Sequence, residues 1–184
     1  MAETRHEIVD LEAFKESTAL TVPESLEGFL AQRLLQYQAE VEALINRPCW
    51  VVVTGEIVTD MIGGGVLVTR RRPVVSIEET TPEEDCIITS GGLIGFTSTS
   101  TASRYLYPST NITISYTSRL PEERENAIIS TIYARAERAL VRAIDEAQST
   151  NSVNEVGYTA SYETEGWTTD EKMALQLMRK RSSR

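Results

Sequence analysis

The sequence predicts an α+β fold that is mainly α-helical. Three observations lead to this prediction. Apolar residues recur at spacings of three and four near both ends of the chain, β-branched residues crowd the middle, and glycine and proline separate these regions. We expect an antiparallel helical bundle with a small antiparallel β-sheet insertion, and an extended C-terminal arm that leads into a closing helix. Residues 1–149 are expected to form the core, and residues 150–184 the arm and its helix.

Two helices are expected before the β region. Residues 10–18 fit a short helix that Asp10 can cap. Residues 22–46 fit a longer one, in which Thr21 and Glu24 have the spacing of a capping box. Its apolar stripe comprises Leu26, Leu30, Leu34, Tyr37, Val41 and Leu44.

After Pro48, which is expected to end the second helix, the pattern changes to that of strands. The predicted β region covers residues 49–117 and begins with CWVVVTGEIV, a run rich in β-branched residues. Its expected parts are a strand at 49–58, a turn at 63–65, two short strands within 66–79 that break near Pro73, a hairpin within 85–107 that turns at Gly91-Gly92, and an alternating strand at 112–116.

Pro121 opens the longest predicted helix, residues 121–148. Glutamates in its first turn suit the positive end of the helix dipole. Its expected buried stripe is Ile128, Ile132, Ala136, Leu140 and Ile144.

The closing segment contains an extended arm and a capped helix. The arm, residues 157–166, alternates weakly and places Tyr158 and Tyr162 on one side. The helix, residues 168–181, begins with a second capping-box spacing, Thr168 and Glu171. Its expected apolar face is Met173, Ala174, Leu177 and Met178.

The chain of 184 residues and 20.5 kDa is acidic, with a net charge of −9 and a pI near 4.8. A surface of this charge argues against wrapping nucleic acid, because phosphate binding requires clustered cations. No run approaches the roughly 18 apolar residues of a membrane span. The N-terminal residues are polar and lack an apolar signal region, so we expect synthesis in the cytoplasm and no membrane partner.

Enzymatic chemistry has little support in the sequence. His6 is the only histidine, and we expect it to be a solvated residue near a mobile N-terminus. Cys49 and Cys86 are far apart and lack metal-ligand spacing, so both are expected to be small buried apolar residues. We therefore predict that the protein is not an enzyme and has no catalytic residue, cofactor or metal.

One acidic cluster keeps a metal site open as an alternative. A solvated loop is the plainer interpretation, since the spacing does not match a calcium loop. A metal enzyme would instead gain cation-dependent stability that Glu83→Gln and Glu84→Gln would remove. The cluster comprises Glu78, Glu79, Glu83, Glu84 and Asp85.

Two basic clusters are candidate contact sites. The first is Arg70, Arg71 and Arg72, which a strand would send to alternating faces. It is expected either to pair with the acidic loop downstream or to contact a neighbouring subunit or DNA phosphate. The second is the C-terminal helix, which either packs on the core with its cations favoured by the helix dipole, or lays its Met and Leu face in a partner's groove. Its cationic residues include Lys172, Arg179, Lys180, Arg181 and Arg184.

Taken in order, these segments resemble the head–tail connector (adaptor) proteins of tailed bacteriophages. The resemblance rests on DLEAFKES followed by PESLEGFLAQRLLQYQAEVEALINRPC, on PVVSI followed by ITISYTS and RLPEERENAIISTIYARAE, and on GYTASY before a Thr-Asp-Glu-capped helix ending in Arg-Lys-Arg. It covers most of the chain. The stretch from 80 to 110 is longer than in compact members of the family.

The resemblance implies a structural virion protein at the head–tail joint. Such proteins form a dodecameric ring beneath the portal protein, extend the DNA channel without reading the DNA sequence, and meet the next connector or tail-completion protein. Their C-terminal segment reaches the portal, which implies docking by the arm and closing helix. The residues assigned to this docking are Tyr158, Tyr162, Trp167, Met173, Leu177, Met178, Arg179, Lys180 and Arg181. We expect the tail to become ordered only on docking.

A second class of function remains open from the residues. A small cytoplasmic regulatory module could use the basic tail to bind nucleic acid. Its DNA affinity would depend on salt and vanish when Arg179, Lys180 and Arg181 are replaced.

Overall fold

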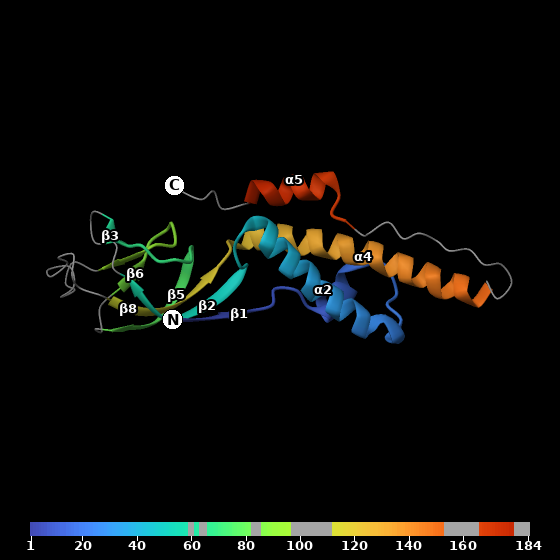
Figure 1. Cartoon of the computed structure of the whole chain (residues 1–184), viewed down its shortest axis with the longest axis horizontal. Helices are drawn as coiled ribbons and strands as arrows, with labels where there is room; N and C mark the ends of the chain where they lie inside the picture. The colour runs from blue at the N-terminus through green and yellow to red at the C-terminus, as the bar shows by residue number, and fades with distance from the viewer. Residues whose placement is uncertain (59–60, 63–65, 82–85, 97–111, 153–165, 179–184) are drawn as a thin grey trace. The chain divides into compact units, whose positions relative to one another are not determined.

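The computed structural model describes residues 1–58, 61–62, 66–81, 86–96, 112–152 and 166–178. The chain divides into two compact units. The β unit comprises Met1–His6 and Pro48–Glu122, and the helical unit comprises Glu7–Arg47 and Glu123–Arg184. The predicted α+β class is confirmed (Figure 1). The predicted division at residue 149 stays a prediction.

Four helices lie in the described part of the chain: α1 (Leu11–Ser17), α2 (Glu24–Ile45), α4 (Glu122–Ser152) and α5 (Thr169–Met178). Within the helical unit, α2 and α4 run in opposite directions, and α5 packs against α2 (Figure 1). Asp10 caps α1 as predicted, because its carboxylate accepts a hydrogen bond from the Ala13 N–H at 3.0 Å.

The predicted N-terminal cap of α2 is wrong, whereas its predicted end near residue 46, just ahead of Pro48, is confirmed. Pro23 occupies the N-cap position and makes no side-chain cap bond, so Thr21 and Glu24 form no capping box. Ile45 is the last helical residue, and the C-cap Asn46 has φ at 57° and ψ at 39°. Asparagine tolerates this left-handed conformation. In it, the backbone N–H of the cap donates to the carbonyl oxygens of Glu42 and Ala43.

The predicted apolar stripes largely form the core of the helical unit. On α2, Leu26 and Leu44 are only half-buried, and Ile45 is buried at its end. On α4, Ile144 is half-buried. The buried stripe residues are Leu30, Leu34, Tyr37 and Val41 on α2, and Ile128, Ile132, Ala136 and Leu140 on α4.

The strands of the β unit form two antiparallel sheets in the described residues. The first has the order β1-β2-β8-β5 and the second β3-β4-β7-β6. Predicted strands at 49–58, within 66–79 and within 85–107 are confirmed, as is the turn at Gly91-Gly92. The strand bounds are β1 Ala2–Arg5, β2 Trp50–Val58, β3 Met61–Ile62, β4 Val66–Leu67, β5 Val74–Thr81, β6 Cys86–Ile88, β7 Ile94–Phe96 and β8 Ile112–Arg119.

One apolar cluster joins the two sheets. Leu67 and Ile94 of the second sheet are buried in the same cluster as side chains of the first. Gly92 lies at the edge of this cluster with φ at 68°, and a Cβ there would be 2.2 Å from the Cβ of Pro73. Any larger residue would therefore separate the β6–β7 turn from the start of β5. The remaining buried members are Val51, Val53, Val58, Val74, Ile112, Ile114 and Tyr116.

The N-terminus is a strand, which corrects the prediction of a mobile end. Residues 2–5 pair with β2 from Ala2 opposite Thr54 to Arg5 opposite Val51. His6 is half-buried and stacks on Trp50, with ring centroids 4.7 Å apart. The sequence pattern did not predict this strand, because its side chains are mostly exposed and show no apolar alternation. Backbone pairing with β2 holds it in place.

A bulge in β2 turns a carboxylate into the β unit. The register of β2 on β8 shifts between Val53 and Glu56, and Gly55 in the bulge has φ at 67°. Glu56 is 8% exposed and accepts a hydrogen bond from the Tyr116 hydroxyl. Burial, followed by this hydrogen bond to the carboxylate, raises the pKa of Tyr116 far above its usual value, so the phenol stays protonated and keeps donating.

This carboxylate and hydroxyl also hold the arginine segment. The Arg70 N–H donates to Oε1 of Glu56 at 2.8 Å, and the Arg71 N–H donates to the Tyr116 hydroxyl at 3.1 Å. The predicted strand at Arg70–Arg72 is therefore wrong: Arg70 and Arg71 lie in a bend, and their backbone N–H groups donate to side chains.

We predict that Tyr116→Phe destabilises the protein by about 1–3 kcal/mol. The substitution keeps the ring but leaves Glu56 and the Arg71 N–H each without one buried partner. Urea unfolding measures the change. Tyr133→Phe is the matched control, because its hydroxyl bonds to the Asp10 carbonyl at an exposed position and should cost less. Equal losses for the two variants would contradict the prediction.

Candidate docking site on the C-terminal helix

The predicted capping box at the start of α5 is confirmed. The Thr168 N–H donates to Oε2 of Glu171 at 2.8 Å, and the Glu171 N–H donates to Oγ1 of Thr168 at 3.2 Å. Nη2 of Arg138 on α4 also donates to both carboxylate oxygens of Glu171, at 2.8 Å to Oε1 and 3.0 Å to Oε2. These contacts order residues 168–171 within the chain itself.

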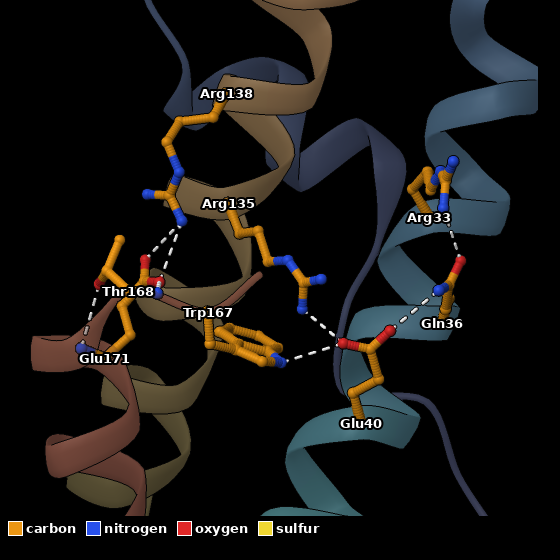
Figure 2. Close-up of polar contacts among 8 residues, drawn as sticks. All are labelled: Arg33, Gln36, Glu40, Arg135, Arg138, Trp167, Thr168 and Glu171. Atoms are coloured by element: carbon orange, nitrogen blue, oxygen red, sulfur yellow. Dashed lines mark hydrogen bonds and ion pairs between the residues drawn. The ribbon is translucent and has the colours of Figure 1, made fainter. Parts of the chain in front are cut away.

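Trp167 fixes the residue before that cap. Its side chain is 8% exposed, and its Nε1–H donates to Oε2 of Glu40 on α2 at 3.0 Å. Figure 2 shows the indole directed between α2 and α4. Its ring meets that of Tyr37 edge to face, with centroids 6.1 Å apart. Its predicted contact with a partner stays a prediction, and within this chain the ring belongs to the core.

Arg135 on α4 completes this cluster. Its Cζ lies 4.0 Å from the ring centroid of Tyr37 and 4.2 Å from that of Trp167. Its guanidinium donates to the same Glu40 oxygen that receives the indole N–H (Figure 2). We name this set the Arg135 cluster: Tyr37, Glu40, Arg135 and Trp167.

The electrostatics of the cluster favour an ionised Glu40. Burial alone would raise the pKa of this carboxyl group. Hydrogen bonds from Arg135 and Gln36, the charge of Arg135 and the indole N–H of Trp167 outweigh burial and hold the pKa below its usual value. Gln36 in turn accepts a hydrogen bond from Arg33 at 2.9 Å, which extends the network along the exposed side of α2 (Figure 2).

The apolar face predicted for α5 is directed mainly to solvent. Met173 is 61% exposed and Leu177 88% exposed, and the two lie one turn apart. Leu175, between them in sequence, is fully buried and is the core contact that the sequence analysis missed. Ala174 is exposed and Met178 half-buried. The helix thus packs on the unit through one side and leaves an apolar pair on another.

The remaining predicted docking residues lie outside the described residues: Tyr158, Tyr162, Arg179, Lys180 and Arg181. The expectation that the tail becomes ordered only on docking stays a prediction, and residues 167–178 have contacts of their own with α2 and α4. Trp167 and Glu171 hold this segment in the lone chain.

The Arg70–Arg72 segment lies in the β unit. Arg71 pairs with Glu3 of β1 at 2.9 Å. Glu83, Glu84 and Asp85 of the acidic loop, the predicted partners, lie outside the described residues. The hydrogen bond from Arg71 lowers the pKa of Glu3. Arg70 is exposed and Arg72 half-buried. Contacts of the three arginines with another subunit or DNA stay predictions.

The structure gives no support to a metal site in the part of the chain it describes. No group of three or more His, Cys, Asp or Glu side chains there is arranged to hold a metal ion. Glu78 accepts hydrogen bonds from Ser76 and Thr117, each at 2.7 Å. The other acidic-cluster members, apart from Glu79, lie outside the described residues. Cys49 is buried as predicted, and Cys86 is only half-buried.

No protein-family model matches the chain, and no curated protein does. Among solved structures, it is similar to a chain from the neck of an empty GTA particle, computed with C6 symmetry. The TM-score is 0.46 and the sequence identity 11%, over 100% of this chain and 97% of the other. Similarity at this level assigns no function. The helices of the described segments are all too short or too polar to cross a membrane.

We predict that acid weakens the attachment of α5. The lowered pKa values of Glu40 and Glu171 mean that their contribution is present above the unfolded-state pKa and is lost as the pH falls through the folded-state values, below 4.5. In a Trp50→Phe background, Trp167 is the only indole. Its emission should shift to longer wavelength as the pH falls below about 5.

The control is the same background with Glu40→Gln and Glu171→Gln, which removes both titrating groups. This variant should show a much smaller acid transition of its emission. A transition of unchanged size would assign the acid response to other groups.

Proposed function

We propose that this protein is a head–tail connector of a virion. In this proposal, twelve copies form a ring beneath the portal protein and extend the channel through which DNA passes. The opposite side of the ring meets the next connector or tail-completion protein. The protein binds no cofactor and catalyses no reaction.

The observation that carries the proposal is the closing helix. Met173 and Leu177 are exposed one turn apart on a helix whose start is capped and whose opposite side is buried through Leu175. A short helix that presents apolar residues at i and i+4 is a common way for proteins to enter a groove. Methionine suits such surfaces, because its side chain is flexible and polarizable.

The order of elements supports the same proposal. The short helix, long helix, strands, proline-led helix and capped closing helix on which the sequence resemblance rests all occur where the sequence predicts them. A ring would require an interface between different faces of neighbouring copies, with a rotation that closes. Attachment through many copies would then hold even if each contact were weak.

Removal of the gene from its source virus tests the proposal. We expect separate tails beside heads that are empty or have leaked DNA, seen by negative-stain microscopy. Normal joined particles would overturn the connector function.

Complementation with variants tests the docking helix. Met173→Ser with Leu177→Ser should fold normally but yield at least about tenfold fewer joined particles, since the docked apolar area is lost. Gln176→Ser, at an exposed position on the same helix, is the matched control and should restore joining. Full restoration by the double variant would remove α5 from the docking site.

The basic tail favours one alternative, a nucleic-acid-binding regulatory module. It predicts DNA affinity in free solution that falls with salt and is abolished when Arg179, Lys180 and Arg181 become Ser. The connector proposal predicts little DNA binding by the free chain. Filter binding at about 50 mM and about 200 mM salt separates the two.

A further inference from the structure

We infer that Arg135 is a positioning residue that sets the direction of α5 before any partner binds. The inference rests on the proposed docking by α5. It concerns how the free chain prepares the helix: the guanidinium, bound to Glu40 and to two aromatic rings, holds Trp167 so that Met173 and Leu177 are directed outward.

The first argument is the choice of a buried cation. The Arg135 side chain is 7% exposed, and it lies among the side chains that join α2 and α4 to the start of α5. Removing a guanidinium from water carries a large desolvation cost, and an apolar residue of similar volume often gives equal stability. Stability alone therefore does not explain an arginine here, whereas a need for fixed geometry does.

The second argument is the directionality of its contacts. An apolar contact between α4 and Trp167 would allow the indole to slide or rotate. Here the ring face contacts the guanidinium at 4.2 Å, and the ring N–H donates to Glu40. Tyr37 contacts the same guanidinium at 4.0 Å and limits its position. The plane and the N–H vector of the indole are thus both specified.

The third argument is that α5 is held at a second point. Glu171, four residues after Trp167, pairs with Arg138, which lies three residues after Arg135 on α4. Two separated contacts fix the axis of a helix, while one would permit it to pivot. Leu175 then packs inward, and Met173 and Leu177 stay exposed. A helix that is already directed loses less conformational freedom on docking.

The test compares the free protein with a Glu40→Gln, Arg135→Met double variant. Met fills the arginine volume, and Gln at position 40 still accepts the indole N–H, so the fold should survive. In a Cys49→Ala, Cys86→Ser background, spin labels at Gln176→Cys on α5 and Gln32→Cys on α2 report the placement of the helix. Both label positions are exposed.

We expect a narrow distance distribution with Glu40 and Arg135 present, and one at least about twofold broader in the double variant. The control pair, Gln32→Cys with Ala134→Cys on α4, should stay narrow in both proteins. Its persistence would show that the α2–α4 packing survives. Equally narrow distributions for the α5 pair would overturn the inference, as would broadening of the control pair to the same extent.

A second measurement separates this inference from the proposed function. If α5 is released in the double variant, connector-free heads should bind that variant more weakly than they bind the wild type. The Gln176→Ser variant, which leaves the Arg135 cluster intact, should bind as the wild type does. Heads that bind both proteins equally would overturn the positioning role and leave the connector function intact. Heads that never bind the wild type would count against the connector function, while the spin-label result would still decide whether Arg135 sets the direction of α5.

Discussion

A single carboxylate oxygen, Oε2 of Glu40, accepts hydrogen bonds from α4 and from the residue that leads into α5. The two partners differ in kind, because Arg135 brings a charge and Trp167 only a dipole. The carboxylate side chain is 34% exposed, whereas the guanidinium is 7% exposed. Water therefore shares the solvation of the anion, and aromatic faces replace it around the cation. The placement of the closing helix depends on this arrangement.

The β unit uses a buried carboxylate in a comparable way. Glu56 is turned inward by a bulge at Gly55, and the Tyr116 hydroxyl and the Arg70 N–H satisfy its two oxygens. An unpaired carboxylate at this depth would cost far more than the bonds return, so all three groups must be placed together. Both units thus obtain a fixed connection from a few polar groups, while apolar stripes supply most of the burial.

Sequence patterns predicted the parts of the fold that depend on local spacing. The apolar stripes of α2 and α4 recur at helical intervals, and most of their residues are buried as predicted. The capping box at Thr168 has its own fixed spacing and is also present. Strand β1 and the Arg135 cluster could not be predicted in this way. Their partners are distant in sequence, with 127 residues separating Trp167 from Glu40. Trp167 was singled out as a partner contact, but nothing local indicated that α2 and α4 would enclose it.

Charge is distributed unevenly along the sequence. Residues 172–184 contain five cationic side chains and no carboxylate, although the whole chain has a net charge of −9. Such a segment is attracted to the rest of its own chain unless something directs it elsewhere. The ion pair between Glu171 and Arg138 has the opposite arrangement, because the acidic side chain belongs to α5 and the basic one to α4. The helix is therefore attached through its acidic first turn, where Glu171 meets Arg138.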